Sequence, residues 1–231
     1  MSCIKEYNEI INYLISLKMP KKVLDMVCIK YYEFDEIVKV LSKIKSIYTI
    51  LEVGSYVGVS TCLLSQFCQK IISIDPNLDI KADCDKYREK GEGKSREYFN
   101  KVMTNFKVNN VIKYDNYFSK VPNNDFIEFH KIYDENLQEI EILPHYCLNG
   151  ESIDVVFLDG DHFKDGVLSD LMKIIDLPNL PKIIILHDVR GKWGNEICEA
   201  VRQFKKNNNY YSKLIKHGNI GFMKLRRKYG I

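Results

Sequence analysis

Short runs of consecutive apolar residues alternate with stretches of helical periodicity from residue 48 onward. Continuous apolar runs are typical of strands that are buried on both faces. We therefore predict strands at Tyr48–Val53, Lys70–Ile74, Val111–Tyr114, Ile153–Leu158 and Lys182–Leu186. The helical stretches between them are Ser60–Cys68, Ala82–Phe106, Asp134–Ile142, Asp165–Ile175 and Asn195–Lys206. Such alternation predicts an α/β fold in which a doubly wound, mostly parallel sheet has helices on both faces.

The two ends of the chain follow different patterns. Between Tyr7 and Ser46 the apolar residues have helical spacing, interrupted by Pro20, so residues 1–47 are predicted to form N-terminal helices. At the other end, Tyr210–Ile215 and Ile220–Leu225 are strand-like runs that flank the turn residues 216–219. This pattern indicates an antiparallel hairpin that closes the sheet. We expect a single domain over residues 1–231, with its core in 48–231.

Composition narrows the class of protein. Hydrophobic residues make up 45% and charged residues 28%, as in ordinary globular domains, and no apolar run is long enough to span a membrane. Lys and Arg exceed Asp and Glu by 34 − 31 = 3, too small an excess to indicate nucleic acid or an anionic membrane as the partner. The seven cysteines are scattered without a Cys-x-x-Cys unit, and no secretory signal is recognisable. We expect reduced thiols and a cytoplasmic location.

Two glycines, Gly54 and Gly58, fall between the first predicted strand and the helix that follows. A turn there either receives a polar small molecule at the start of the helix, or is simply tight. The Gly-x-Gly-x-x-Gly spacing of dinucleotide sites is missing, which argues against an NAD-dependent oxidoreductase. At the end of the next strand, Asp75 can accept the two hydroxyls of a ribose, or it caps a helix before Pro76.

Three polar residues end the fourth and fifth predicted strands. Asp159 follows one strand, and His187 and Asp188 follow the next. The carboxyl ends of parallel strands share one edge of the sheet, so these side chains should be neighbours there. Either they hold a hard divalent cation, or Asp159 caps the next helix and Asp188 forms a salt bridge.

Four motifs in order resemble class I S-adenosylmethionine-dependent methyltransferases. They are Glu52-Val-Gly54-Ser55-x-x-Gly58-x-Ser60-Thr61, Ile74-Asp75, Phe157-Leu-Asp-Gly-Asp-His162 and Ile185-Leu-His-Asp188. The Asp-Gly-Asp-His block is similar to that of small-molecule O-methyltransferases, among them macrolide-sugar enzymes. The resemblance runs from about residue 48 to the C-terminal hairpin and implies a seven-stranded, Rossmann-like methyltransferase sheet.

The resemblance implies that the cofactor S-adenosylmethionine (SAM) lies at the first two motifs. Its methionine moiety would contact the turn, and Asp75 would hold its ribose. Asp115 and Asn116, after the third strand, would border the adenine. The residues of the cofactor site are then Glu52, Gly54, Ser55, Tyr56, Gly58, Ser60, Thr61, Asp75, Asp115 and Asn116.

The resemblance also favours a magnesium or manganese ion at Asp159, His187 and Asp188. Many relatives carry an acidic residue where this chain has His187, so His187 either is a ligand through nitrogen or only lines the pocket. His162 is the expected general base, since an ordinary histidine pKa of about 6.5 leaves it largely neutral at pH 7. Asp161 is the rival base.

The function expected from these residues is methyl transfer from SAM to a hydroxyl of a sugar or glycan, assisted by a divalent cation. A catechol or phenol acceptor is one alternative, and a catalytically inactive binding partner is another. Methylation of nucleic acid is disfavoured because no basic face or base-specific motif stands out. The expected partner is a small-molecule or glycan acceptor, with no membrane. The sequence is also compatible with an oligomer and with one module of a larger glycan-building polypeptide.

Overall fold

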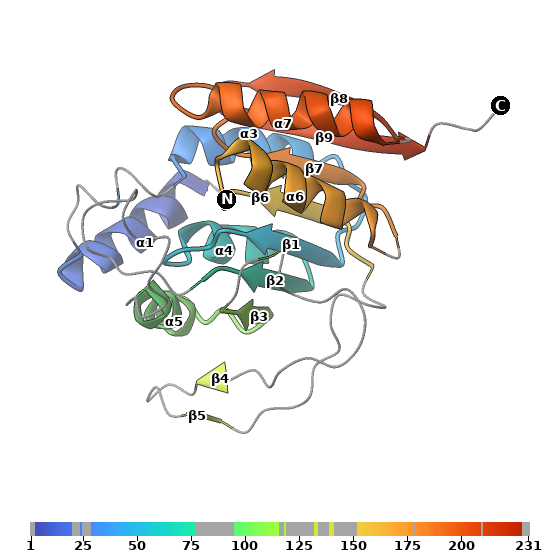
Figure 1. Cartoon of the computed structure of the whole chain (residues 1–231). Coiled ribbons are helices and arrows are strands. Elements are labelled where there is room, and N and C mark those ends of the chain that lie inside the picture. Colours follow the sequence, from blue (N-terminus) through green and yellow to red (C-terminus); the bar gives the residue numbers. More distant parts are fainter. Residues whose placement is uncertain are drawn as a thin grey trace.

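The computed structural model describes residues 3–19, 24, 29–76, 95–115, 118, 132–133, 139–140, 152–177, 179–208 and 210–227 (Figure 1). Its helices are α1 (Cys3–Ser16), α3 (Tyr31–Leu41), α4 (Val59–Leu64), the 3-10 helix η1 (Ser65–Phe67), α5 (Ser95–Asn105), α6 (Lys164–Ile175) and α7 (Gly194–Asn207). Its strands are β1 (Thr49–Val53), β2 (Lys70–Ile74), β3 (Val111–Tyr114), β4 (Ile132–Tyr133), β5 (Glu139–Ile140), β6 (Val155–Leu158), β7 (Ile183–Leu186), β8 (Tyr210–His217) and β9 (Ile220–Arg227). None of the helices in these ranges is long and apolar enough to cross a membrane.

A seven-stranded sheet forms the centre of the fold, in the order β3-β2-β1-β6-β7-β9-β8. Strands β3, β2, β1, β6 and β7 are parallel to one another, whereas β9 pairs antiparallel with both β7 and β8. The prediction of a doubly wound, mostly parallel sheet with a C-terminal antiparallel hairpin and N-terminal helices is confirmed. All parallel strands therefore end at the same edge of the sheet.

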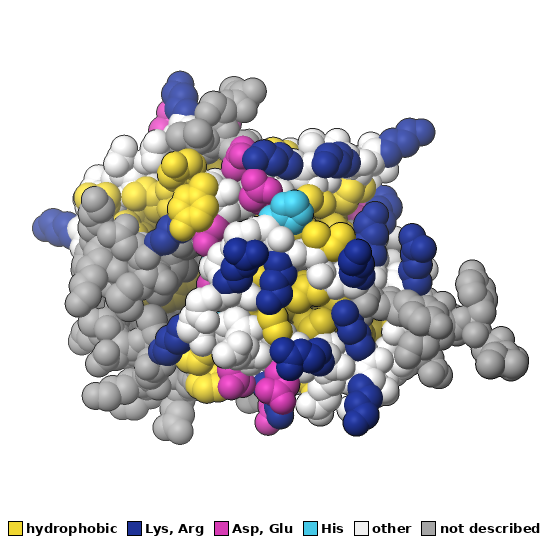
Figure 2. All heavy atoms as spheres, turned by 90° about the horizontal axis from the view of Figure 1, so that it is seen from above, with side chains coloured by type: hydrophobic (Ala, Val, Ile, Leu, Met, Phe, Trp, Pro, Cys, Tyr) yellow, Lys and Arg dark blue, Asp and Glu magenta, His cyan; other side chains and the backbone are white. Residues whose placement is uncertain are grey.

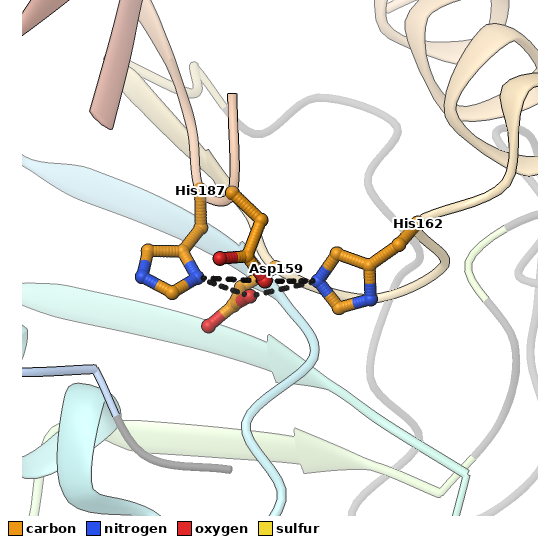
Figure 3. A group of neighbouring side chains, drawn as sticks. Asp159, His162 and His187 are labelled. Carbon is orange, nitrogen blue, oxygen red and sulfur yellow. Dashed lines mark hydrogen bonds and ion pairs between the residues drawn. The ribbon is translucent and has the colours of Figure 1, made fainter. Parts of the chain in front are cut away.

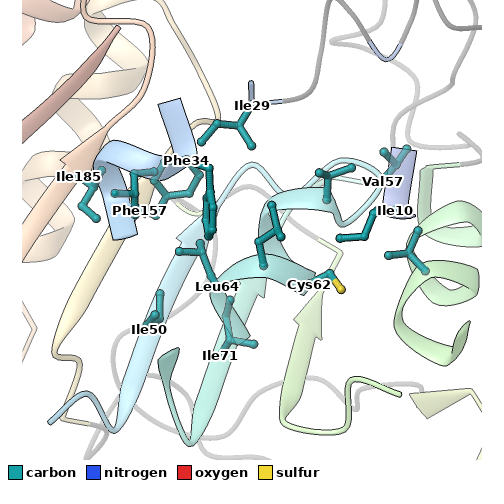
Figure 4. Packing of buried hydrophobic residues seen from close by; sticks show 14 of the residues in the cluster. Ile10, Ile29, Phe34, Ile50, Val57, Cys62, Leu64, Ile71, Phe157 and Ile185 are labelled. Atoms are coloured by element: carbon teal, nitrogen blue, oxygen red, sulfur yellow. The ribbon is translucent and has the colours of Figure 1, made fainter. Parts of the chain in front are cut away.

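Alternate residues of the central strands point to opposite faces of the sheet, as the two-residue repeat of a strand requires. Ile50, Phe157 and Ile185 pack with α1, α3, α4 and α5 in one core cluster. Figure 4 shows Phe34 of α3 beside the last two of them. Leu51, Val156 and Ile184 belong to a second core cluster on the other face, together with residues of α6 and α7. These two helices lie side by side (Figure 1). Because both faces are covered, continuous apolar runs were a valid strand signal.

The strand and helix predictions hold apart from small shifts at element ends and the following differences. The strand predicted at Ile153–Leu158 begins at Val155, and the hairpin turn contains only Gly218 and Asn219, because β8 continues to His217. The helix predicted at residues 134–142 is wrong at Glu139 and Ile140, which pair with β4 in a two-stranded sheet. Of the helix predicted at 82–106, residues 95–105 are helical and residues 82–94 lie outside the described ranges.

Basic side chains gather on the face seen from above, near α7 and the β8–β9 hairpin (Figure 2). β8 is an edge strand, and Lys213 and Lys216 on it are exposed. Lysines on an edge strand oppose pairing with another chain. Lys213 and Lys216 are therefore suited to protect this edge of the sheet.

Candidate active site at the carboxyl edge of the sheet

The turn after β1 carries the first predicted motif. Gly54 and Gly58 have φ values of +90° and +86°, a region that favours glycine, and Gly58 precedes α4 as its N-cap. Tyr56 also has a positive φ, 46°. Its backbone N–H donates a hydrogen bond to Asp75 Oδ2 at 2.9 Å. The structure thus brings the turn and the predicted ribose-binding residue into direct contact.

Asp75 is 4% exposed, and its Oδ1 atom has no hydrogen-bond partner within the described residues. Burial raises the pKa of this carboxyl, and attraction from Lys113 on β3 opposes the rise. Lys113 donates a hydrogen bond from Nζ to Ser55 Oγ at 2.7 Å. Asp75 therefore has one satisfied oxygen and one buried oxygen that is free to accept a hydrogen bond.

Glu52 and Thr61, two residues predicted for the cofactor site, are fully buried. Both are 0% exposed, and the Thr61 hydroxyl donates to Glu52 Oε2. Burial raises the pKa of Glu52 to about 7, although hydrogen bonds from Ser60 and Thr61 lower it. The hydrogen bond between Glu52 and Thr61 links β1 to α4 within the core. Ser60, 6% exposed, is at the start of the same helix.

The predicted adenine-binding residues are described only in part. Asp115 follows β3 and forms an ion pair with Arg96 of α5. Asn116 lies outside the described residues.

Asp159, His162, His187 and Asp188 form a compact cluster at the ends of β6 and β7. Each offers a donor atom within 4.8 Å of the others. His187 Nδ1 is 2.9 Å from Asp159 Oδ1 and 3.5 Å from Asp188 Oδ2. His162 Nε2 is 3.4 Å from Asp159 Oδ1 and 3.1 Å from Asp188 Oδ2. Figure 3 shows the two imidazoles on either side of Asp159. The structure thus unites all three predicted metal ligands and adds His162.

The charges in this cluster stabilise one another. Burial opposes the cationic form of His162, but hydrogen bonds and attraction from Asp159 and Asp188 outweigh it and raise its pKa to about 9. Burial opposes the anionic form of Asp188, yet its contacts with His162 and His187 hold its pKa below the ordinary range. The expectation that His162 is largely neutral at pH 7 is therefore wrong for this arrangement. The reason is that two carboxylates face one imidazole.

Asp161, the rival base, is not in this cluster. Its side chain is exposed, and its Oδ1 accepts a hydrogen bond from the Phe163 N–H at 2.9 Å. It lies against Gly166 of α6, where a Cβ would be 2.4 Å from the Asp161 carboxyl carbon. Asp161 therefore contacts the start of α6, whereas His162 contacts the carboxylates of the cluster. The ring of Trp193 stacks on His162, with centroids 5.8 Å apart, and adds an aromatic wall beside the cluster.

Comparison with known proteins identifies the family. A family model described as a methyltransferase domain matches residues 51–189, which contain the glycine turn, Asp75 and the whole cluster. The chain belongs to this methyltransferase family. In the comparison with curated proteins, no sequence matches the chain.

Solved methyltransferases share the fold at low sequence identity. The SAH-bound methyltransferase PaMTH1 of Podospora anserina is 12% identical, with a TM-score of 0.63 over 95% of this chain and 87% of that one. The O-methyltransferase TomG of Streptomyces achromogenes, in complex with SAM, is 11% identical, with a TM-score of 0.58 over 95% and 88%. A Bacillus cereus O-methyltransferase in complex with SAH is 13% identical, with a TM-score of 0.56 over 95% and 89%.

Sequence reasoning missed three residues at the site of this methyltransferase. Lys113 contacts the glycine turn from β3, Glu33 contacts His187 from α3, and Asn219 contacts Asp188 from the β8–β9 turn. One signal for Glu33 was present. It shares a helical face with Ile37 and Leu41, which are buried, so the helical repeat placed an acid toward the core.

Proposed function

We propose that this methyltransferase transfers a methyl group from SAM to a hydroxyl of a sugar or glycan, assisted by a divalent cation. The observation that carries the proposal is the convergence of Asp159, His162, His187 and Asp188 next to the glycine turn. The contact between the two sites is direct, because a Cβ on Gly54 would lie 2.1 Å from the Asp159 carbonyl oxygen. A cofactor at the turn and an acceptor at the cluster would be neighbours, as in-line methyl transfer requires.

The residues of the turn fit SAM. Gly54 and Gly58 have the positive φ values that let the turn pass close to the Asp159 backbone and lead into α4, next to the polar cluster where the methionine moiety would lie. The buried Oδ1 of Asp75 lacks a hydrogen bond that a ribose hydroxyl would supply. Ser55 and Tyr56 form the wall between these points, while Glu52, Ser60 and Thr61 support the turn from within the core.

The cluster fits a magnesium or manganese ion. The carboxylates of Asp159 and Asp188 and an imidazole nitrogen of His187, within 4.8 Å of one another, are donor types that manganese accepts, and the carboxylates also suit magnesium. Such a cation supplies a Lewis acid that lowers the pKa of an acceptor hydroxyl and orients it.

His162 is the proposed general base. It faces the same two carboxylates that would hold the cation, so the imidazole proton and the cation compete for their negative charge. With the charge of Asp159 and Asp188 neutralised in this way, His162 becomes able to accept the proton of a hydroxyl. Asp161 is not among the four residues whose donor atoms lie within 4.8 Å of one another, and its Oδ1 accepts from the Phe163 N–H, which favours His162 over it.

The test is transfer of a labelled methyl group from SAM to a panel of sugars, glycans and catechols, in magnesium, manganese or EDTA. We expect product with a sugar or glycan, at least a tenfold loss in EDTA, and loss of comparable size in Asp188→Asn and His162→Ala. Asp165→Asn, an exposed change on α6, is the matched control. Product in undiminished yield in EDTA would overturn the role of the cation. SAM binding without transfer to any acceptor would favour the inactive binding partner.

A further inference from the structure

Glu33 is a buried carboxylate from outside the matched methyltransferase domain. It lies in α3 and is 6% exposed, and its helix neighbours Phe34, Ile37 and Leu41 are core residues. A carboxylate in such a position is costly unless its oxygens are hydrogen-bonded. Its partners therefore indicate why an acid is present there.

Both oxygens of Glu33 accept hydrogen bonds. Oε2 accepts from the Lys30 backbone N–H at 2.8 Å, which caps α3, and lies 3.1 Å from His187 Nε2. Oε1 accepts from Asn219 Nδ2 at 3.1 Å. The same Asn219 amide nitrogen lies 2.5 Å from Asp188 Oδ1. One carboxylate thus reaches His187 directly and Asp188 through a single amide.

We propose that Glu33 is a positioning residue that presents His187 Nδ1 and the Asp188 carboxylate to a divalent cation. This inference rests on the cation site of the proposed function. A carboxylate accepts a hydrogen bond only from a protonated nitrogen, so Glu33 keeps the proton of His187 on Nε2. Nδ1, which lies 2.9 Å from Asp159 Oδ1, is then the ring nitrogen that would give up its proton and bind a cation. Outer carboxylates of this kind orient histidine ligands and strengthen their binding of metal ions.

The position of Asp188 also needs support. Its φ is 53°, a value that non-glycine residues rarely adopt. The Asn219 side chain bridges Asp188 and Glu33, and the Asn219 backbone carbonyl accepts from the Val189 N–H at 3.0 Å. Both Glu33 and Asn219 lie outside residues 51–189, so this support comes from the N-terminal helices and the C-terminal hairpin. The two ends of the chain would complete the site.

The packing of α3 against the sheet and the hydrogen bonds of Glu33 involve different side chains, so a substitution can remove the second without the first. Phe34 anchors the helix beside Phe157 and Ile185 (Figure 4). Glu33→Gln keeps the shape of the side chain but removes its charge and weakens its hold on Nε2–H. Asp35→Asn, on the exposed side of the same helix, is the matched control.

The experiment is a titration of each full-length protein with manganese, with free ion measured by electron paramagnetic resonance. We expect Glu33→Gln to bind manganese about 10- to 100-fold more weakly, and Asp35→Asn to stay within about twofold of the parent. Nitrogen-15 spectra of the metal-free parent should show that the neutral His187 ring has its proton on Nε2. Titration with SAH should give unchanged affinity in both variants, which reports that the cofactor turn is intact.

Each outcome has a distinct meaning. Equal manganese affinity in the parent and Glu33→Gln would overturn the positioning role and leave the proposed function standing. A deprotonated Nε2 in the parent would also overturn the role. Failure of the parent to bind manganese would remove the cation from the proposed function and this inference with it, whereas retained SAH binding would preserve the cofactor assignment.

Discussion

Gly54 packs against the backbone of Asp159 so closely that a Cβ at Gly54 would lie 2.1 Å from the Asp159 carbonyl oxygen. The two residues directly follow the adjacent parallel strands β1 and β6, and the Asp159 N–H donates to the Val53 carbonyl at 2.8 Å. This contact links the glycine turn to the polar cluster. A change at one site should therefore be felt at the other.

Replacement of Gly54 by alanine tests this link. We expect Gly54→Ala to lower the free energy of unfolding by about 2–4 kcal/mol, because the new Cβ overlaps backbone atoms in addition to the strain of its positive φ. SAH binding should be lost as well. Gly218→Ala is the control, since Gly218 has a φ of +59° with nothing within 4 Å of an added Cβ. Equal losses of stability in the two variants would show that overlap with Asp159 is unimportant.

Asp170 of α6 predicts a specific pH dependence of stability. Burial raises the pKa of this carboxyl to about 7, and repulsion from Asp161 adds to the rise. The folded state then binds more protons than the unfolded state between about pH 4 and 7, so stability falls as pH rises through that window. Asp170→Asn removes the penalty. We expect it to be more stable than the parent at pH 8, by up to about 4 kcal/mol, with a smaller difference at pH 5.

Urea denaturation at the two pH values measures this effect. Asp176→Asn, an exposed change just after the same helix, should leave the pH dependence as it is. If the gap between Asp170→Asn and the parent were the same at pH 5 and pH 8, the raised pKa would be refuted.

Asp154 predicts a loss of stability without loss of cofactor binding. It is 8% exposed at the opposite edge of the sheet, where its carboxylate accepts hydrogen bonds from the Tyr48 N–H at 2.6 Å and the Thr49 N–H at 3.2 Å. Lys182 Nζ lies 2.8 Å away. Asp154→Asn should cost about 1–3 kcal/mol. Because these contacts outweigh burial and lower the Asp154 pKa, the difference should shrink as pH falls below about 4.

Thermal or urea unfolding, followed by SAH titration, checks the Asp154 prediction. SAH affinity within about twofold of the parent is expected, since the change is remote from the glycine turn. A large loss of SAH affinity in a folded Asp154→Asn protein would contradict the separation of the two sheet edges.

The sequence predicted the sheet well because its signal is local. The β1 run Thr49–Val53 is apolar apart from Thr49 and Glu52, and the structure covers both faces. The helix prediction failed at Glu139 and Ile140 because short polar stretches with few apolar positions do not distinguish a helix from a strand. The pairing of Glu139 with Tyr133 depends on a partner strand, which no local pattern specifies.

The candidate site was predictable where it follows strand ends. Asp159, His187 and Asp188 meet because β6 and β7 are parallel neighbours, which the alternating pattern indicated. Glu33 is 154 residues from His187, and its contact depends on how α3 docks. The charge state of His162 was mispredicted for a related reason, since its pKa depends on two carboxylates brought together by the fold.

The most direct test of the account is calorimetric titration of SAH into the purified protein, with NAD as the control ligand and with magnesium, manganese or EDTA present. The glycine turn and the unpartnered Asp75 oxygen predict micromolar SAH binding that persists in EDTA, and no binding of NAD. Absence of SAH binding in all three conditions would contradict the cofactor assignment. Binding of NAD in place of SAH would favour an NAD-dependent enzyme.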